Sequence, residues 1–352
     1  MIKCMTGACM ALLIATPTVA VADNFTATIV AGHPPVFRWV KMLDAAFVPA
    51  VRDKLEGSGH AITFTGLYGG AVAGVGEELE AVEAGLAEIG ICQSLFDPAK
   101  LAEQNVTYYT PFVSSDPRLV SETMDDLHER DPRMQQAYED NGVRYLGAPL
   151  AIDDYLLMTN FPVGSLDDLE GRKIAAPGAA INWLLGTGAV GVSGNLTTYY
   201  NELKAGVFDG VLVFGSAALP GKLHEVAPYV LRAGLGAQFA GGLCVNRGWW
   251  DGLPPEVQAA LEDGADAAQA WYVGELEAAV DGAMSAMAAE GATISDAPPE
   301  LRQAWANGME NAAGAWAEGL DGMGRPGSEI LAAYMDAMRD AGAEPLRDWD
   351  QE

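Results

Sequence analysis

The sequence contains few residues whose types and spacing could catalyse a reaction. The segment 186-GTGAVG-191 matches the G-x-G-x-x-G pattern of dinucleotide-binding turns, but that pattern holds a pyrophosphate only between a strand and a helix. Here the preceding 179-AAINWLL-185 is typical of a helix that Gly186 would cap. The chain has no G-x-S-x-G, H-E-x-x-H or C-x-x-C motif. We therefore expect no cofactor and no enzymatic activity.

The remaining titratable side chains are scattered along the chain. His128 and His224 fall on charge-rich, helix-like segments, so we expect them at the surface. His33 differs, because it follows the first predicted strand, where open α/β folds bind their ligands. The neighbouring acids Asp153 and Asp154 could act as a general acid and base, and the alternative is that they are solvated turn residues.

Aromatic residues form a more coherent group. A set of them is predicted at strand ends or helix starts: Tyr68, Phe96, Tyr155, Trp183, Phe214 and Phe239. Taken one by one, each is typical of a protein core. Together they would make the apolar wall of a pocket for a small ligand.

The charge of the chain excludes one class of partner. Acidic residues outnumber basic ones by 48 to 20, which gives a formal net charge of −28. Such a field repels nucleic acid and anionic lipid, and no cluster of Lys and Arg interrupts it. We therefore expect no nucleic-acid binding. With 50% apolar and 19% charged residues, the composition indicates a packed globular chain.

The first 22 residues have the composition of a targeting segment. A basic start, MIK, precedes the apolar run 5-MTGACMALLIATPTVA-20, and 20-AVA-22 supplies a cleavage site. We predict a signal peptide at 1–22 and a mature chain outside the cytoplasm. Cleavage leaves Cys92 and Cys244, both in apolar strand-like runs, and a disulfide and a pair of buried thiols both stay open.

From residue 23 onward, predicted strands and helices alternate. The first part gives, in order, strand 25–32, helix 35–55, strand 60–70, helix 76–86 and strand 87–94. The second part gives helix 118–142, a long or broken strand over 143–160, strands 172–177 and 207–215, and nearly continuous helix from 255 through Glu290. This alternation indicates an α/β fold, and the lack of a linker favours two domains whose strands cross.

Several segments resemble a known family. They are 79-LEAVEAGLAEIGICQS-94, 167-DDLEGRKIAAPG-178, 202-ELKAGVFDG-210 and 245-VNRGWWDGLPPEVQAAL-261. In this order they resemble the solute-binding proteins of TRAP transporters, the DctP-like receptors. The resemblance extends over roughly residues 25–345 in one register.

This resemblance implies a two-lobed α/β fold of the periplasmic binding protein type, with crossing strands and a long helix that braces both lobes. It implies lobe I at 23–148 plus 212–252, lobe II at 149–211 plus 253–310, and C-terminal helices at 311–352 that pack on the lobes. The lobes would close over a small organic solute in the periplasm and deliver it to membrane permease subunits. We expect a monomer.

The same resemblance indicates an altered specificity. In the family, an arginine at the position of Ala175 pairs with a carboxylate of the solute, and a companion arginine corresponds to Tyr155 or Leu156. The polar residues that follow the Asp-Gly turn are replaced here by the apolar segment 211-VLV-213. Because a buried carboxylate without a partner costs several kcal/mol, we expect a different ligand.

The favoured ligand is a small amine or amino alcohol, held by Asp153 or Asp154 with Gln93 and aromatic faces. Two alternatives stay open: a neutral or aromatic solute on apolar walls, and an acid whose charge is met by Arg38 or Arg232. Family members that bind keto acids through a metal carry an acid and a tryptophan just after the Asp-Gly turn. Apolar residues occupy those positions here, so we predict no bound metal.

The candidate solute-contacting residues combine both lines of reasoning. They are His33, Tyr68, Gln93, Phe96, Asp153, Asp154, Tyr155, Ala175, Asn182, Trp183, Val213, Phe214 and Phe239.

Overall fold

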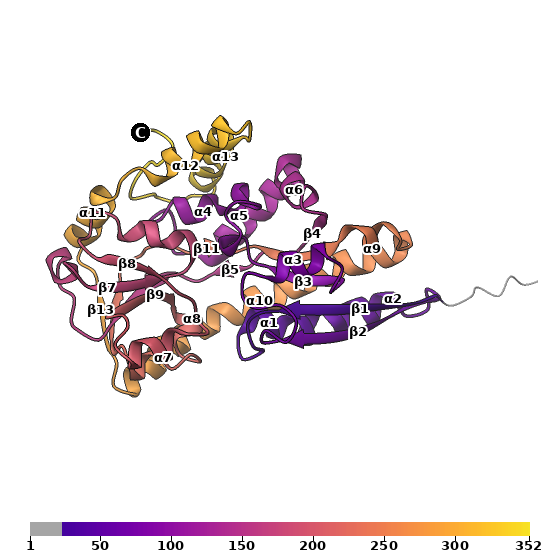
Figure 1. Ribbon diagram of the computed structural model, residues 1–352, viewed down its shortest axis with the longest axis horizontal. Coiled ribbons are helices and arrows are strands. Elements are labelled where there is room, and N and C mark those ends of the chain that lie inside the picture. Colours follow the sequence, from indigo (N-terminus) through magenta and orange to yellow (C-terminus); the bar gives the residue numbers. More distant parts are fainter. Residues whose placement is uncertain (1–22) are drawn as a thin grey trace, which may run out of the picture.

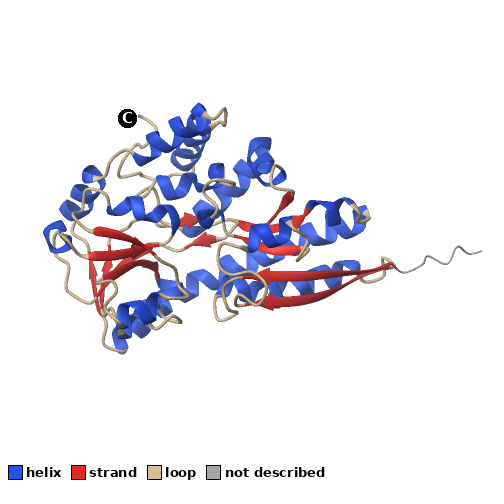
Figure 2. Ribbon diagram, in the orientation of Figure 1, coloured by secondary structure: helices blue, strands red, loops and turns tan. Residues whose placement is uncertain are grey.

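The computed structural model describes residues 23–352, and the predicted signal peptide lies outside the described residues. The chain forms two α/β lobes, each built on a β-sheet that is covered by helices (Figures 1 and 2). In Figure 1 the first lobe lies to the right and the second to the left. None of the described helices combines the length and the apolar character that crossing a bilayer requires.

The first lobe contains a five-stranded sheet with the order β2-β1-β3-β12-β4. Its strands are β1 (Asp23–Ala31), β2 (His60–Tyr68), β3 (Ile89–Cys92), β4 (Val143–Gly147) and β12 (Gly242–Asn246). β1 runs parallel to β2 and β3, whereas β12 runs antiparallel to β3 and β4. The late strand β12 therefore returns to a sheet that the first part of the chain began.

The second lobe contains a six-stranded sheet with the order β13-β10-β6-β9-β7-β8. Its strands are β6 (Tyr155–Thr159), β7 (Lys173–Ala176), β8 (Val190–Ser193), β9 (Gly210–Phe214), β10 (Tyr229–Arg232) and β13 (Thr293–Asp296). β6 is antiparallel to β9 and β10, and the other pairs are parallel. This is a mixed sheet rather than the parallel sheet that simple alternation suggests.

The chain crosses between the lobes where two short strands pair. β5 (Ala151–Ile152) lies antiparallel to β11 (Gln238–Phe239). The long strand predicted over 143–160 is therefore broken into β4, β5 and β6. β9 and β10 both belong to the second sheet, so the return to the first lobe comes after β10 and not at residue 212, where the sequence placed it.

The helices follow the predicted pattern, with local breaks. They are α1 (Arg38–Met42), α2 (Val48–Leu55), α3 (Glu78–Glu83), α4 (Val106–Tyr109), α5 (Pro117–Arg130), α6 (Pro132–Glu139), α7 (Tyr199–Lys204), α8 (Gly215–Ala218), α9 (Arg247–Asp251), α10 (Pro255–Ala289), α11 (Pro299–Gly308), α12 (Ala312–Gly322) and α13 (Gly327–Asp340). A π-helical turn at Leu43–Phe47 joins α1 to α2. The single helix expected over 118–142 is split at Pro132, because a proline holds the residue before it out of the helical conformation.

The long helix α10 connects the two lobes. It has 35 residues and packs against α1 and α2 of the first lobe and against α8 and β13 of the second (Figure 1). Gly264 permits its close approach to α2, because a Cβ atom there would lie 2.4 Å from Cγ2 of Val51. The hydroxyl of Tyr272 donates a hydrogen bond to the carbonyl oxygen of Ala151 in β5, at 2.7 Å. α12 packs against α4, and α13 packs against α4 and α5.

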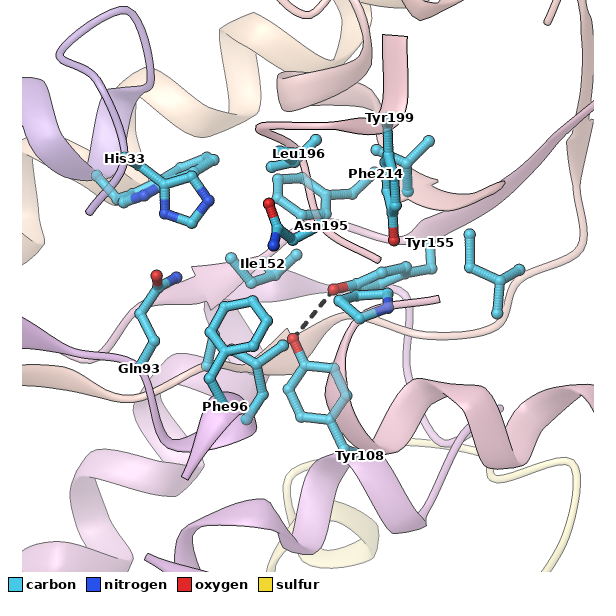
Figure 3. A pocket seen from close by; sticks show the side chains of 16 residues that line it. His33, Gln93, Phe96, Tyr108, Ile152, Tyr155, Asn195, Leu196, Tyr199 and Phe214 are labelled. Carbon is cyan, nitrogen blue, oxygen red and sulfur yellow. Dashed lines mark hydrogen bonds between the residues drawn. The ribbon is translucent and has the colours of Figure 1, made fainter. Parts of the chain in front are cut away.

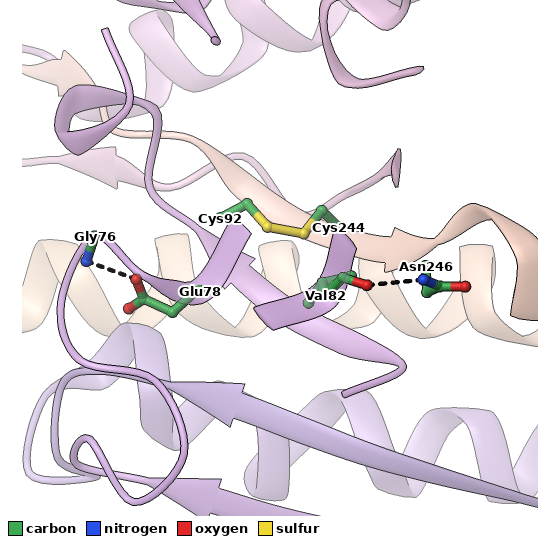
Figure 4. The surroundings of a disulfide bond; sticks show 6 residues. All are labelled: Gly76, Glu78, Val82, Cys92, Cys244 and Asn246. Carbon is green, nitrogen blue, oxygen red and sulfur yellow. Dashed lines mark hydrogen bonds between the residues drawn. A yellow bond between two sulfur atoms is a disulfide. The ribbon is translucent and has the colours of Figure 1, made fainter. Parts of the chain in front are cut away.

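A disulfide joins two neighbouring strands of the first sheet. Cys92 in β3 and Cys244 in β12 are bonded, with their Cα atoms 5.8 Å apart (Figure 4). Close by, the side-chain amide of Asn246 donates to the carbonyl oxygen of Val82 at 2.8 Å. Of the two possibilities that the sequence left open, the structure has the disulfide, and its first cysteine directly precedes Gln93.

Candidate functional site

A cavity lies between the two lobes, at the ends of strands from both sheets (Figure 3). Its atom-free space, including solvent at its mouth, is about 400 Å³. The 16 residues that line it are His33, Trp39, Gln93, Leu95, Phe96, Tyr108, Ile152, Tyr155, Pro177, Asn195, Leu196, Tyr199, Leu212, Val213, Phe214 and Ala240. None of these residues is Asp, Glu, Lys or Arg, so the wall is mainly aromatic and aliphatic.

One side of the cavity has a polar edge, supplied by the first lobe. His33 follows β1, Trp39 belongs to α1 and Gln93 follows β3. Their side chains are 3%, 2% and 5% exposed, and His33 Nε2, Trp39 Nε1 and Gln93 Oε1 have no hydrogen-bond partner in the described part of the chain. Burial lowers the pKa of His33 to about 4, although the amide of Gln93 opposes this effect. The imidazole is therefore neutral at physiological pH.

Asn195 and three tyrosines supply the other polar groups. The hydroxyl oxygens of Tyr108 and Tyr155 lie 3.0 Å apart, so one donates to the other and the second hydroxyl keeps a proton to donate (Figure 3). Tyr199 donates to the carbonyl oxygen of Gly194 at 3.3 Å. Burial raises the pKa of each of these three hydroxyls above the ordinary tyrosine value, so they remain protonated.

A buried carboxylate holds the loop that carries His33. Glu78, at the start of α3, accepts the backbone N–H of Gly32 at 2.8 Å and that of Gly76 at 2.7 Å (Figure 4). Gly32 is packed so tightly that a Cβ atom there would lie 2.4 Å from the nitrogen of Val75. Glu78 therefore joins the loop after β1 to the loop after β2.

Part of the predicted site set lines the cavity. Its members there are His33, Gln93, Phe96, Tyr155, Val213 and Phe214. Trp183 lies behind the wall, where it stacks on Tyr108 at 5.8 Å and donates its indole N–H to that residue's carbonyl oxygen. Tyr68 donates to Asp44 at 3.0 Å, away from the cavity. Phe239 packs beside His128, with 5.5 Å between ring centroids.

Of the two predicted acids, Asp153 is buried and Asp154 is partly buried, and neither is a lining residue. Asp153 accepts the backbone N–H and the hydroxyl of Ser216 at the start of α8. Asp154 accepts the backbone N–H of Gly236 at 2.8 Å. Burial raises the pKa of both carboxyls to about 6, and these hydrogen bonds oppose the rise. Both carboxylates therefore already accept hydrogen bonds near the segments that cross between the lobes. They are not the solvated turn residues of the alternative interpretation.

Ala175 and Asn182 also lie outside the lining. Ala175 is fully buried in β7, and a Cβ atom built at Gly194 would lie 3.4 Å from its Cβ and 2.7 Å from Cε1 of Tyr199. Gly194 therefore lies against both Ala175 and the Tyr199 ring. Asn182 lies half-buried in the 3₁₀ segment Gly178–Leu184.

The structure corrects the expectation for two histidines. His128 and His224 are buried and not at the surface. His128 lies 2.7 Å from both the carbonyl oxygen of Met124 and the side-chain oxygen of Gln104. His224 Nε2 lies 2.7 Å from a carboxylate oxygen of Glu290. Their partners come from nearby turns and from distant segments, which a local pattern of charge does not reveal.

Several lining residues carried no signal of their own in the sequence. They are Trp39, Tyr108, Asn195, Leu196 and Tyr199. Trp39 could have been predicted, because it lies near the start of the predicted helix that follows the His33 loop. Within residues 23–352, no group of three or more His, Cys, Asp or Glu side chains is arranged to hold a metal ion.

Comparison with known proteins identifies a matching family. The model of the bacterial extracellular solute-binding proteins of family 7, DctP, matches residues 51–318. A marine metagenome TRAP solute binding protein solved with co-purified pyroglutamate has a TM-score of 0.78 and 17% identity, over 89% of this chain and 99% of that chain.

Two further solved structures show the same likeness. A Bordetella pertussis extracytoplasmic solute receptor that binds pyroglutamic acid has a TM-score of 0.78 and 17% identity, over 90% of this chain and 99% of that chain. A TRAP solute binding protein from Rhodoferax ferrireducens T118, solved with copurified benzoate, has a TM-score of 0.78 and 17% identity, over 90% and 98%. At these identities the likeness shows the fold alone.

Proposed function

Because the chain belongs to the DctP family, the bacterial extracellular solute-binding proteins of family 7, we propose that it is the extracytoplasmic receptor of a TRAP transporter. It binds one small organic solute between its lobes, in the periplasm, and delivers it as a monomer to membrane permease subunits. The observation that carries this proposal is the cavity, because both lobes contribute to its wall and because its residues provide hydrogen-bonding groups on an apolar surface.

The residues proposed to contact the solute come from both lobes. From the predicted set they are His33, Gln93, Phe96, Tyr155, Val213 and Phe214, and the structure adds Trp39, Tyr108 and Tyr199. The two sheets are the cores of the proposed lobes, and α10 braces them while they close.

Charged solutes find little support in this cavity. The amine that the sequence favoured needs a carboxylate, but Asp153 and Asp154 lie outside the wall and already accept hydrogen bonds from Ser216 and Gly236. An acid needs a cation, yet Arg38 and Arg232 are not lining residues, and Arg232 pairs with Asp296 at the surface. Of the three ligand classes considered, a neutral or aromatic solute agrees best with these walls.

A thermal-shift screen of neutral, acidic and basic solutes tests the receptor function. A ligand at 100 times its Kd adds about 2.7 kcal/mol to the free energy of unfolding, so a true solute raises Tm clearly. Chromatography of the same mixture should recover the solute unchanged. Conversion of a solute to product, as in a secreted hydrolase, would contradict the proposal, and so would the absence of any shift across the library.

A further inference from the structure

The cavity wall gives a more specific description of the solute, provided that the receptor function proposed above holds. Three acids are next to lining residues in the sequence: Asp97 follows Phe96, Asp153 follows Ile152 and Asp154 precedes Tyr155. A bound anion would therefore be repelled by a chain whose net charge is −28, with acidic residues next to the wall in the sequence. The wall supplies no cation to offset that repulsion.

The unpartnered donors point against a cation. The indole N–H of Trp39 can only donate and has no partner in the described part of the chain, and one hydroxyl of the Tyr108–Tyr155 pair keeps a proton that their mutual hydrogen bond does not use. An ammonium group also brings only donors, so it would leave both protein donors unpaired. Buried donors without an acceptor are costly, which favours a solute that carries a carbonyl or hydroxyl oxygen.

The same polar edge also favours a solute that carries a hydrogen-bond donor. Gln93 Oε1 is buried and meets no donor in good hydrogen-bond geometry, although it is near enough to the His33 ring to oppose the fall in that ring's pKa, and the neutral His33 ring offers one donor and one acceptor. Apart from Asn195 and the tyrosines, the remaining wall is apolar and includes Phe96, Leu212 and Phe214. The complementary molecule therefore has an acceptor and a donor on one side and an apolar body on the other.

From this arrangement we propose that the solute is an uncharged small molecule, of the amide or lactam class, with an adjacent acceptor and donor on a ring-sized apolar body. Its carbonyl oxygen accepts from Trp39 and from the tyrosine pair, and its N–H group donates to Gln93. Aromatic residues of both lobes enclose the body. At the position where the resemblance implies an arginine that selects a carboxylate, this chain has Ala175, which is fully buried.

Calorimetry with three probes of similar shape tests this class: benzamide, benzoate and benzylammonium. Because a buried charge without a counter-charge costs far more than one neutral hydrogen bond contributes, we expect benzamide to bind at least about 100-fold more tightly than either ion. Benzoate or benzylammonium binding as tightly as benzamide would overturn the proposal. So would a set of hits in the broader screen that contains only charged solutes, although the receptor function would then stand.

Two substitutions locate the effect in the polar edge. Trp39→Phe keeps an aromatic ring but removes the N–H donor, and it should weaken benzamide binding about 5-fold. Gln93→Glu adds a charge without changing shape, and it should weaken benzamide binding at least about 10-fold and improve benzylammonium binding. The matched control is Gln303→Glu, which makes the same charge change on the exposed face of α11. Equal benzamide affinities in Gln93→Glu, Trp39→Phe and the control would overturn the proposed contacts.

Discussion

Replacing Glu78 by Gln tests how the wall that carries His33 is held. Glu78 is 1% exposed and accepts the N–H groups of Gly32 and Gly76. A glutamine has one acceptor oxygen, so it mimics the protonated acid and leaves one of these N–H groups unpaired. We therefore expect solute affinity to fall about 5-fold at neutral pH, the equivalent of about one hydrogen bond.

The same substitution should weaken solute binding but should make the protein more stable, relative to the natural protein, as pH rises. Burial raises the pKa of Glu78 from 4.5 to about 7, while the two N–H groups oppose the rise and Asp97 adds to it. The folded protein then binds the proton more tightly than the unfolded chain, so the stability from Glu78 is complete below pH 4.5 and is lost as pH rises to about 7. At about 1.36 kcal/mol per pKa unit, that loss is on the order of 3 kcal/mol. The Gln variant does not titrate and should not show it.

Urea unfolding of both proteins between pH 4.5 and 7.5 measures this difference. The free energy of unfolding of Glu78→Gln, relative to the natural protein, should increase by about 3 kcal/mol across that range. Asp97, whose pKa burial also raises to about 7, remains in both proteins, so its own titration cancels apart from its repulsion with Glu78. The matched control is Glu77→Gln, at the exposed neighbouring position. Parallel pH profiles for Glu78→Gln and the natural protein would refute the reasoning.

Three other predictions concern packing, the disulfide and the replaced arginine. Gly264→Ala should lower the free energy of unfolding by about 1–3 kcal/mol, because its Cβ meets Val51, whereas Gly274→Ala in the same helix has open space and should raise it by about 0.5–1 kcal/mol. Equal effects in urea unfolding would contradict the contact between α10 and α2. Reducing the Cys92–Cys244 disulfide should lower the same free energy by about 2–4 kcal/mol, and unchanged unfolding curves with and without reductant would contradict its presence. Ala175→Arg should destabilise the protein without creating benzoate affinity, because the site is fully buried. Tight benzoate binding by this variant in calorimetry would show that the family's anion site persists.

Elements with a strong local pattern could be predicted from the sequence. The Ala-rich run from 255 to Glu290 corresponds to α10 (Pro255–Ala289), and the strand at 25–32 corresponds to β1. β8 was missed because it is a short and mostly exposed strand within a glycine-rich segment, so it lacks a buried face. The sheet to which β9 and β10 belong depends on pairing with β6 and β7, which the local sequence does not encode.

The site was predictable where it follows strand ends and unpredictable where it depends on distant partners. His33 was predicted because ligands bind beyond the carboxyl ends of parallel strands, and Gln93 was predicted from the family resemblance; both line the cavity. Asp153 and Asp154 have the appearance of site acids in the sequence, but Ser216 and Gly236 engage them from segments more than fifty residues away. Trp39 and Tyr199 lie on helices, where an aromatic residue is indistinguishable from a core residue until the lobes are placed together.

A competition experiment tests the central claim, the absence of charge on the solute, most directly. The purified receptor is mixed with equal amounts of neutral, anionic and cationic solutes of similar size, separated from unbound molecules by ultrafiltration and then denatured. Mass spectrometry identifies what is released. The account predicts an uncharged molecule with both a donor and an acceptor. A carboxylate or an ammonium compound as the main retained species would contradict it.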